Sequence, residues 1–421
     1  MFAQSRRRTE QPAEAGTQAH CSRVAAVADL IAHHLFLASE EKAVLRQACL
    51  AHHQRKGLLD PRSMDRLLAD VGSSLCPPRE AGNGPPGVAD VLHASEVPRT
   101  GDSLAQRLAG ILRLADAFDQ GMESQIFEGT DAREVLESLR PGIEAGLWPA
   151  QIWEALEVCT RPVLPLSPQS WTVPVFPEAA TRMLSLIRGS FSGLAQVSEA
   201  VSLDPATAGL VLQLANSALF GSSSRVSTIS QAVMRLGCAT VYRVVTTAAL
   251  RGSFVSARLV GLWPHSLEVA DFSQQLACQN GRVDPGVAYL AGLLHDVGRI
   301  ALLSVPLYDH ARIEGLGANG CPALYAEDLL LGSNHARIGA QIAGQWRLPE
   351  EIVSAIGQHH WPETAGSPLA HLLYLAEYLS GAEEDLPSFL RLEMALRGTG
   401  LRWEDVRECK VSELGNWLVA A

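Results

Sequence analysis

The sequence predicts an all-α protein built from two helical bundles. Hydrophobic residues make up 47% of the chain and aromatic residues only 6%, and Ala and Leu are abundant. That composition favours packed helices over a β-sandwich. Strand-like alternation of polar and apolar residues is scarce. Because 421 residues are too many for one ordinary hydrophobic core, we expect two domains.

A proline-rich segment separates the two predicted bundles. Residues 161–174 hold four prolines, and proline both stops a helix and holds the preceding residue in extended backbone. We therefore expect a linker at 161–173, between a first domain at 1–160 and a second at 174–421. A shorter run rich in Pro and Gly, at 76–87, is expected to form a loop inside the first domain.

Helix boundaries are clearest early in the second domain. Asp204 and the proline after it are typical of a helix start, and the apolar spacing continues this helix over 206–219. Ser230 is expected to cap a second helix over 231–236, which Gly237 ends.

Charge and composition exclude several classes of protein. The formal net charge is −11, from 34 basic and 45 acidic residues. Such a chain lacks the broad positive field that non-specific nucleic-acid binding requires, so we expect protein partners and no direct contact with nucleic acid. No stretch of 18 apolar residues predicts a membrane span, and no apolar segment follows Arg6–Arg8 to form a secretory signal. Eight cysteines without a CxxC pair fit reduced thiols in a cytoplasmic protein.

A pattern of histidines and acids occurs twice. Each domain carries a histidine before an apolar helix, a His-His or His-Asp pair about 30 residues later, and an acid near its end. In the first domain these are His20, His52-His53 and Asp116, and in the second His265, His295-Asp296 and Glu377. The similarity suggests an internal repeat in which one supersecondary plan is used twice.

The adjacent pair His295-Asp296 is unusual on an apolar helix, because both side chains cost free energy when buried without a partner. A divalent metal is one such partner, since imidazole and carboxylate both bind Fe, Mn, Zn or Mg. Further candidate ligands for such a metal are His265, His335, His359, His360 and Glu377. A bound metal would acidify a water molecule and hold a phosphate, which is a route to phosphate-ester hydrolysis.

The second domain resembles the HDOD (HD-related output domain) family. The matching segments, in the family's order, are Val173–Glu178, Val201–Pro205, Leu214–Ala218, Val226–Ala232, Trp263–Ser266, Ala291–Gly298, His335–Gly339, Trp346–Pro349 and Gln358–His360. His265, His295-Asp296 and Glu377 look like the H…HD…D signature of the wider HD superfamily of metal-dependent phosphohydrolases. The resemblance implies that His265, His295, Asp296 and Glu377 are the metal ligands. HDOD domains are regarded as mostly non-catalytic modules of bacterial signalling. The resemblance therefore implies a regulatory or output module that binds partner proteins, with a nucleotide second messenger as a candidate ligand.

Two residues depart from the pattern of active HD enzymes. Glu377 replaces the usual aspartate, and its extra methylene would either spoil a tight site or shift its metal. Arg299 stands where active HD-GYP enzymes usually have lysine. These departures favour binding over turnover. The alternative is a phosphohydrolase acting on a cyclic dinucleotide or nucleotide, with Arg299 and one of His335 or His359 holding the phosphate. Two further alternatives to a binding function stay open. In one, His295 and Asp296 form a hydrogen-bonded pair that only holds helices together; in the other, the protein is a structural scaffold between signalling proteins and has no ligand.

Three further positions have two interpretations each. Adjacent helical residues point about 100° apart, so we expect only one of His359 and His360 to face the site and the other to face solvent or an interface. His335 either faces the site or caps a helix. Asn216 either satisfies a buried backbone group or marks a binding surface.

The first domain resembles a degenerate HD-GYP domain, the branch that hydrolyses cyclic di-GMP. His20–Ala25 is similar to its opening helix, and Ile111–Asp119 to the helix with its last aspartate. His53 stands where the family has the aspartate of the HD pair, and no GYP segment lies between 54 and 110. The resemblance implies an inactive domain. Its remnant site consists of His20, His52, His53 and Asp116.

Overall fold

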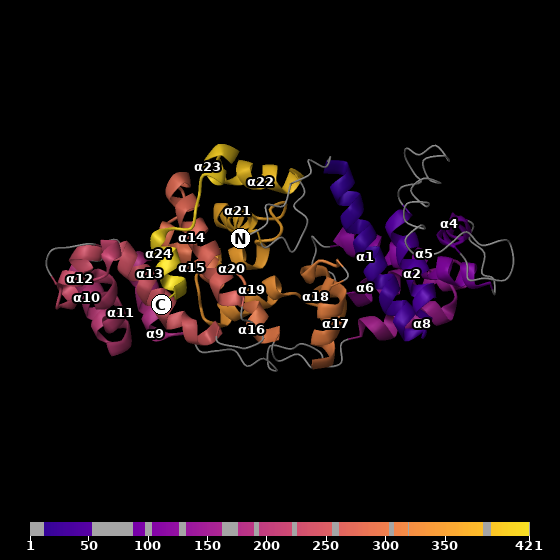
Figure 1. Ribbon diagram of the computed structural model, residues 1–421, viewed down its shortest axis with the longest axis horizontal. Helices are drawn as coiled ribbons and strands as arrows, with labels where there is room; N and C mark the ends of the chain where they lie inside the picture. Colours follow the sequence, from indigo (N-terminus) through magenta and orange to yellow (C-terminus); the bar gives the residue numbers. More distant parts are fainter. Residues whose placement is uncertain are drawn as a thin grey trace. The chain divides into compact units, whose positions relative to one another are not determined.

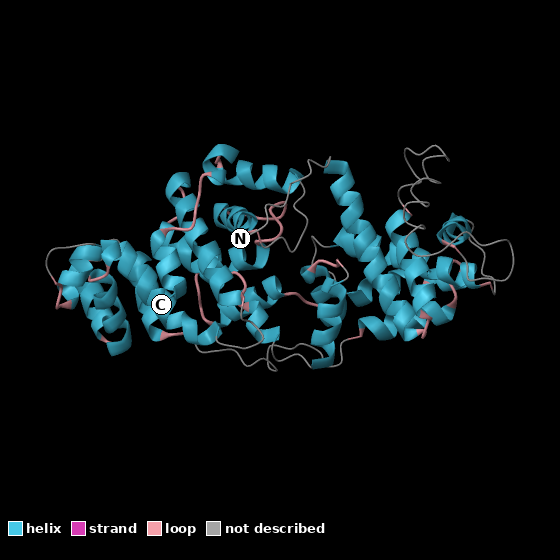
Figure 2. Ribbon diagram, viewed as in Figure 1, coloured by secondary structure: helices cyan, strands magenta, loops and turns pink. Residues whose placement is uncertain are grey.

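The computed structural model confirms the predicted all-α fold class. It describes residues 12–52, 87–96, 103–125, 132–161, 176–188, 193–220, 225–254, 261–302, 307–318, 320–381 and 389–420. Throughout these ranges the regular structure is helical and contains no strand (Figure 2). None of the helices in them combines the length and the apolar character that crossing a bilayer demands.

The helices form two compact units. The first consists of Met1–Pro165 and Leu307–Gly332, and the second of Leu166–Pro306 and Ser333–Ala421. The segment Leu307–Gly332 therefore packs with the first unit, although it lies within the sequence of the predicted second domain. The expected linker at 161–173 and the expected loop at 76–87 lie almost entirely outside the described residues. The predicted domain limits thus stay a prediction.

The first unit is organised around one central helix. Its helices are α1 (Pro12–His34), α2 (Ser39–Ala51), α4 (Val88–Glu96), α5 (Leu104–Gln125), α6 (Ala132–Leu139), α7 (Pro141–Glu144), α8 (Ala150–Thr160), α17 (Leu307–Ala318) and α18 (Ala323–Leu331) (Figure 1). Helix α1 packs against α2, α5 and α8. All five residues of the stretch Val24–Ala28 are buried. A helix that is apolar and buried around its whole circumference belongs in the interior, and this places α1 in the core.

The second unit has two helical layers. Its helices are α9 (Glu178–Arg188), α10 (Leu194–Ser202), α11 (Pro205–Ala215), α12 (Ile229–Leu236), α13 (Cys238–Arg251), α14 (Leu262–Asn280), α15 (Pro285–Leu294), α16 (Gly298–Leu302), α19 (His335–Gln345), α20 (Glu350–Gln358), α21 (Pro368–Ser380), α22 (Phe389–Thr399), α23 (Trp403–Arg407) and α24 (Glu413–Ala420), with 3₁₀ turns η1 (Ala218–Phe220) and η2 (Gly252–Phe254) (Figure 1). Helices α9 to α13 pack on one another, and α13 joins them to α15.

Helices α14 and α15 form a tight hairpin at the centre of the second unit. Gly292 makes the close approach feasible, since a Cβ at this position would lie 2.7 Å from the Cα of Ala270. This register brings the start of α14 beside the end of α15. The two ends carry His265 and His295.

Helix α11 begins where predicted and ends earlier than predicted. The Asp204 carboxylate accepts hydrogen bonds from two amides of the first turn, at 3.0 and 3.3 Å. The helix ends at Ala215, not at residue 219. Asn216 ends it, because the Asn216 side chain forms hydrogen bonds of 2.8 and 2.9 Å with the backbone N–H and C=O of Val226. The Asn216 side chain thus satisfies the backbone N–H and C=O of buried Val226, as the first of its two interpretations predicted.

The predicted cap of helix α12 was wrong by two residues. Thr228, not Ser230, has extended backbone, and its Oγ1 accepts the amide of Gln231 at 3.3 Å. Ser230 lies inside the first turn of α12. Gly237 ends the helix as predicted, with φ of 78°, a conformation that favours glycine.

Candidate metal centre

Seven side chains of the types that can bind a metal converge inside the second unit. They come from the start of α14, the turn after α15, the start of α19, the turn after α20, and α21. In chain order they are His265, His295, Asp296, His335, His359, His360 and Glu377. All four predicted metal ligands belong to this set.

Glu377 joins the two histidines that the α14–α15 hairpin brings together. Its Oε2 lies 2.9 Å from His295 Nε2, and its Oε1 lies 3.4 Å from His265 Nε2. The two Nε2 atoms are 3.2 Å apart. The longer glutamate side chain therefore reaches both rings, so the departure from aspartate does not remove the carboxylate from the cluster.

Asp296 lies between two groups of histidines. Its Oδ1 is 3.2 Å from His335 Nε2, and its Oδ2 is 3.6 Å from His295 Nε2. The Oδ2 atom also accepts a 2.8 Å hydrogen bond from Arg299 Nε. One carboxylate thus faces both halves of the cluster and is oriented by a guanidinium.

The expectation that one of His359 and His360 faces solvent or an interface was wrong. Both are buried, with 0% and 6% of their surface exposed. Helix α20 ends at Gln358, so both histidines follow the helix and its 100° spacing does not apply. Their ring centroids are 3.9 Å apart, and His360 Nε2 lies 2.9 Å from His335 Nε2.

Two of the histidines are held by the ends of their own helices. His295 is the C-cap of α15 and His359 is the C-cap of α20. Each Nδ1 donates to the carbonyl three residues earlier, Gly292 at 2.7 Å and Ile356 at 2.6 Å. In a neutral ring this leaves the lone pair on Nε2, directed away from the helix, which is the usual tautomer of a metal-ligating histidine.

The donor set fits a metal. Nε2 of His359 is buried and has no hydrogen-bond partner among the described residues. A buried imidazole nitrogen without a partner costs free energy, and a metal ion would remove that cost. The carbonyl ends of α15 and α20, which carry His295 and His359, add partial negative charge that favours a cation.

The protonation states of the cluster also suit a cation. Burial alone would raise the pKa of Asp296, but the charges of Arg299, His295 and His335 lower it below its usual range. Burial and the neighbouring histidines lower the pKa of His359 to about 3, so this ring stays neutral. Burial would also lower the pKa of His295, but Asp296 and Glu377 outweigh it and raise the value to about 9. His295 must therefore release a proton when it binds a metal at neutral pH.

Close backbone packing sets the position of His335. A Cβ at Gly298 would collide with the carbonyl oxygen of His335 and come within 2.7 Å of Gly339 N. Only glycine at position 298 lets α16 and α19 approach this closely. Asn334 caps α19, with Oδ1 accepting the amide of Arg337 at 3.1 Å. His335 is thus the first residue of α19 and points into the cluster, the first of its two interpretations.

The cluster is open at one edge. The side chains of His265, Arg299 and Glu377 are 18%, 19% and 12% exposed, whereas those of Asp296 and His335 are 4% or less exposed. Arg299 therefore lies where an anionic ligand could reach it. The other two residues predicted to hold phosphate, His335 and His359, are buried among the metal donors. Their phosphate-binding role stays a prediction.

A smaller cluster occurs in the first unit. His20, His52 and Asp116 bring their donor atoms together. Asp116 Oδ1 lies 3.1 Å from His20 Nε2 and 3.5 Å from His52 Nε2. His53, the fourth predicted member, lies outside the described residues. The structure therefore brings together three of the four residues of the predicted remnant site.

Sequence reasoning missed Asp119, which is fully buried beside this smaller cluster. Its Oδ2 accepts a 2.7 Å hydrogen bond from His20 Nδ1, and Arg23 donates to both carboxylate oxygens at 2.8 and 3.0 Å. A signal was present, because Asp116 and Asp119 are three residues apart and so share one face of α5. Burial would lower the pKa of His20, but Asp116 and Asp119 outweigh it and raise the value to about 9.

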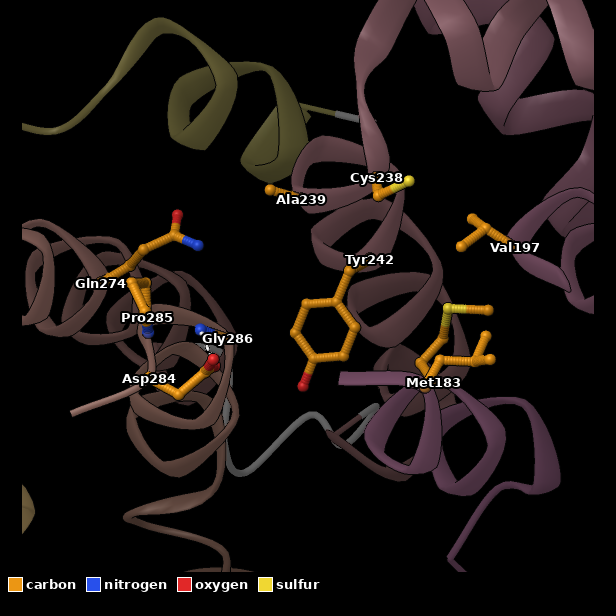
Figure 3. A pocket seen from close by; sticks show the side chains of 10 residues that line it. Met183, Val197, Cys238, Ala239, Tyr242, Gln274, Asp284, Pro285 and Gly286 are labelled. Atoms are coloured by element: carbon orange, nitrogen blue, oxygen red, sulfur yellow. Dashed lines mark hydrogen bonds between the residues drawn. The ribbon is translucent and has the colours of Figure 1, made fainter. Parts of the chain in front are cut away.

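The second unit also encloses an apolar cavity of about 330 Å³ between the α9–α13 layer and the α14–α15 hairpin. Figure 3 shows the ring of Tyr242 between Met183 and Val197 on one side and Asp284 and Gln274 on the other. The Asp284 carboxylate is already used, because it accepts the first amides of α15 at 2.8 and 3.0 Å. None of the seven metal donors lines this cavity, so it is separate from the metal cluster.

Comparison with known families gives a match that covers much of the second unit and the segment Leu307–Gly332 of the first. Residues 173–362 match the family model for the HDOD domain. The chain contains an HDOD domain. The expected resemblance is thereby confirmed for these residues, whereas the HD-GYP resemblance of the first domain stays a prediction. Six of the seven metal donors fall inside the HDOD match, and Glu377 lies 15 residues beyond it.

Curated relatives share only part of their length with this chain. A protein of Treponema pallidum described as uncharacterized is 28% identical over 195 residues, 44% of this chain and 37% of that protein. Ribonuclease Y of Acetivibrio thermocellus is 30% identical over 156 residues, 36% of this chain and 25% of the enzyme. Ribonuclease Y of Lawsonia intracellularis is 38% identical over 122 residues, 28% of this chain and 18% of the enzyme. The chain thus spans well under half the length of these relatives.

Two solved structures that are similar to this chain cover a little over half of it. An HDOD domain protein of unknown function from Geobacter sulfurreducens is 23% identical, with a TM-score of 0.49, and covers 59% of this chain and 88% of that one. A response regulator of Methylococcus capsulatus is 24% identical, with a TM-score of 0.30, and covers 55% of this chain and 96% of that one.

Proposed function

We propose that this chain is a signalling protein whose HDOD domain binds a divalent metal centre and acts as a regulatory binding module. The observation that carries the proposal is the convergence of five imidazoles and two carboxylates in one buried cluster. A cluster that only tied helices together would not need a buried His359 Nε2 without a hydrogen-bond partner among the described residues.

The arrangement suits two metal ions. One group of donors consists of His265, His295 and Glu377, and the other of His335, His359 and His360. Asp296 lies between them, with Oδ2 toward the first group and Oδ1 toward the second. Imidazole-rich sites favour Fe, Mn or Zn, whereas Mg prefers oxygen donors. We therefore expect first-row transition metals, which the two groups of donors and Asp296 would hold.

A regulatory role is favoured over turnover by two features. HDOD domains, which residues 173–362 match, are regarded as mostly non-catalytic. In addition, Arg299 stands where active HD-GYP enzymes usually have lysine, and its Nε donates a 2.8 Å hydrogen bond to Asp296. The net charge of −11 favours protein partners over nucleic acid. A nucleotide second messenger is the candidate small ligand, with its phosphate at the exposed edge formed by Arg299. We place this activity in the cytoplasm.

A second candidate function is phosphohydrolysis of a cyclic dinucleotide or nucleotide. The specific observation in its favour is that His265, His295, Asp296 and Glu377 lie together and that Glu377 reaches both of its histidines. Bound metals would polarise a phosphate ester and lower the pKa of a water molecule. Arg299 would then orient the phosphate at the open edge of the cluster.

Elemental analysis of the full chain, loaded with Fe, Mn or Zn and then desalted, tests the proposal. We expect bound metal in the wild type and its loss in Asp296→Ala and His359→Ala. His34→Ala is the matched control, since His34 is exposed and lies outside both clusters. A wild type that holds no more metal than Asp296→Ala would overturn the proposal.

Turnover separates the two functions. Metal-loaded protein is assayed with bis(p-nitrophenyl) phosphate and with cyclic di-GMP, beside His295→Ala. Metal binding without turnover supports the regulatory module. Turnover that disappears in His295→Ala supports the hydrolase, whereas equal turnover in that variant assigns the activity to a contaminant.

A further inference from the structure

The apolar cavity of the second unit is a candidate site for a small molecule. Its volume of about 330 Å³ lies at the lower end of the range of small-molecule sites, roughly 300–1,000 Å³. Apolar groups form most of its wall, with Met183 from α9, Val197 from α10, Ala239 from α13 and Pro285 from α15. Helices α9, α10, α13 and α15 thus surround a space that suits a compact and largely apolar organic molecule.

A buried hydroxyl group in the wall of the cavity has no partner among the described residues. The side chain of Tyr242 lines the cavity, and only 4% of the surface of this residue is exposed. Figure 3 shows its hydroxyl in the space between Asp284 and Met183. The hydroxyl of Thr246, close by on the same helix, also lacks a hydrogen bond, so the two groups do not satisfy each other. A buried hydroxyl without a partner costs free energy, and a polar group on a ligand would remove that cost.

The protonation state of Tyr242 determines which polar group would pair with it. Burial raises the pKa of this phenol above its usual range, so the hydroxyl keeps its proton at neutral pH. A phenol donates one hydrogen bond through that proton. The ligand group that pairs with the proton is therefore an acceptor, for example a carbonyl oxygen.

The charges in the wall disfavour an anionic ligand. Asp284 is exposed at the edge of the cavity, and its carboxylate accepts the backbone amides of Gly286 and Val287 at 2.8 and 3.0 Å. None of the described residues that line the cavity is lysine, arginine or histidine. A negatively charged ligand would therefore meet a carboxylate and no basic side chain, an arrangement that costs free energy.

We propose that this cavity binds a small uncharged molecule with an apolar body and a hydrogen-bond acceptor. The apolar body packs on Met183 and Val197, and the acceptor takes the hydrogen bond of the Tyr242 hydroxyl. The proposal goes beyond the metal centre of the HDOD domain, since none of the seven metal donors lines this cavity.

Ligand binding would join the two layers of the second unit. Met183 and Val197 belong to the α9–α13 layer, whereas Pro285 and Gly286 form the first turn of α15 in the central hairpin. A ligand that contacts both layers stabilises their packing, because it binds the native arrangement in preference to an opened one. Hydrogen exchange of the α13 and α15 amides should therefore slow when the ligand is present.

Calorimetric titration of the full chain tests the proposal, with acetophenone and 2-octanone as probes. Each probe is uncharged and carries a single carbonyl oxygen, on an aromatic body in the first and an aliphatic body in the second. Benzoate, which has nearly the size of acetophenone and a negative charge, is the comparison. We expect at least one of the two ketones to bind, and benzoate to bind about tenfold more weakly than that ketone or not at all.

Two substitutions locate the bound ketone. Ala239→Trp places an indole in the wall of the cavity and should lower the affinity about tenfold or more. Tyr242→Phe removes only the hydroxyl and should lower the affinity about threefold to tenfold, the usual contribution of one hydrogen bond. The matched controls are Ala206→Trp, at an exposed helical alanine, and Tyr378→Phe, both outside the described lining of the cavity. Each control should bind the ketone as the wild type does.

The proposal is overturned if neither ketone binds at millimolar concentration, or if benzoate binds as tightly as the ketones. It is also overturned if Ala206→Trp weakens binding as much as Ala239→Trp does, or if Tyr242→Phe leaves the affinity unchanged. A second titration in excess EDTA keeps the result independent of the metal proposal. Ketone binding that persists in EDTA supports the cavity, whereas binding that disappears belongs to a metal centre and overturns the proposal. Unchanged hydrogen exchange of α20 and α21 in Ala239→Trp and Tyr242→Phe verifies that these variants are folded.

Discussion

The histidine clusters of the two units share the placement of one histidine and differ in the residues around it. In each unit a histidine lies directly after the last residue of a helix, His52 after α2 and His295 after α15. Each donates its Nδ1 proton to the carbonyl three residues earlier, Cys49 at 2.5 Å and Gly292 at 2.7 Å. The same local rule therefore directs Nε2 toward an acid in both units.

The residues that surround this histidine differ between the two units. In the second unit Asp296 and three histidines from later helices add donors around a central space. In the first unit Asp119 accepts a hydrogen bond from His20 Nδ1, and Arg23 donates to both oxygens of Asp119. The cluster of the second unit thus offers seven candidate donors to a cation, whereas that of the first unit offers three among the described residues, His20, His52 and Asp116. A histidine in the same place after a helix therefore does not fix how many donors a cluster offers, because the surrounding residues decide that number.

The largest expected effect concerns Asp119. Asp119→Ala would leave Arg23 and His20 buried without their carboxylate, and breaking a buried ion pair costs about 3–5 kcal/mol. We expect hydrogen exchange in α1 and α5 to accelerate accordingly. Asp116→Ala is the comparison, with a smaller cost, because the Asp116 side chain is 24% exposed. Equal costs would contradict a structural role specific to Asp119.

A smaller effect is expected from Gly298→Ala in the second unit. The new methyl group would collide with the backbone of His335, and overpacking of this kind costs about 1–3 kcal/mol. Displacement of His335 should also reduce the metal content. Gly344→Ala lies on α19, the helix that carries His335. No atom of the described residues outside this helix's own backbone lies within 4 Å of the new Cβ, so the variant should be neutral or stabilising. If both variants kept their metal, the link between backbone packing and the cluster would be lost.

The pH dependence of stability should differ between the clusters. His20 has its pKa raised from 6.5 to about 9 in the folded first unit. Its stabilising contribution is therefore complete below pH 6.5 and is lost as the pH rises through about 9. We expect a loss of about 1–2 kcal/mol, because solvent that reaches Asp116 screens part of the interaction. Thermal or urea unfolding between pH 6 and 10, beside His20→Gln, measures it; an unchanged profile in that variant would assign the effect to another group.

In the second unit the raised pKa of His295 makes metal binding depend on pH. His295, with its pKa raised to about 9, must lose its proton to bind a metal, so metal affinity should increase as the pH rises toward 9. Competition with a chelator at several pH values checks this. A metal affinity that falls over this range would argue against His295 as a ligand.

The smallest expected effect is that of Glu377→Asp. The shorter side chain restores the acid of the HD signature but withdraws the carboxylate from His265 and His295, at 3.4 and 2.9 Å. Neighbouring groups can adjust, so we expect metal affinity to change by about tenfold or less, about 1.4 kcal/mol. Glu377→Gln, which keeps the length and loses the charge, should weaken binding more. The reverse order would mean that side-chain length matters more than charge at this position.

Local signals in the sequence determined much of this protein. The helical composition determined the fold class, Asp204 determined the start of α11, and Gly237 the end of α12. The His-Asp pair with His265 and Glu377 identified the metal candidates, since the HD signature depends on residue type and order. These features depend on neighbours in the chain or on a fixed motif, so they can be read without tertiary structure.

Contacts between distant segments were decided only by the tertiary structure. His360 faces the cluster because α20 stops one residue before the histidine pair, and the pairing of Asp119 with Arg23 spans 96 residues. The segment Leu307–Gly332 packs with the first unit although it lies in the HDOD stretch of the sequence. Packing between helices depends on the shape and charge of surfaces that come together only after folding, and no local pattern records which surfaces will meet.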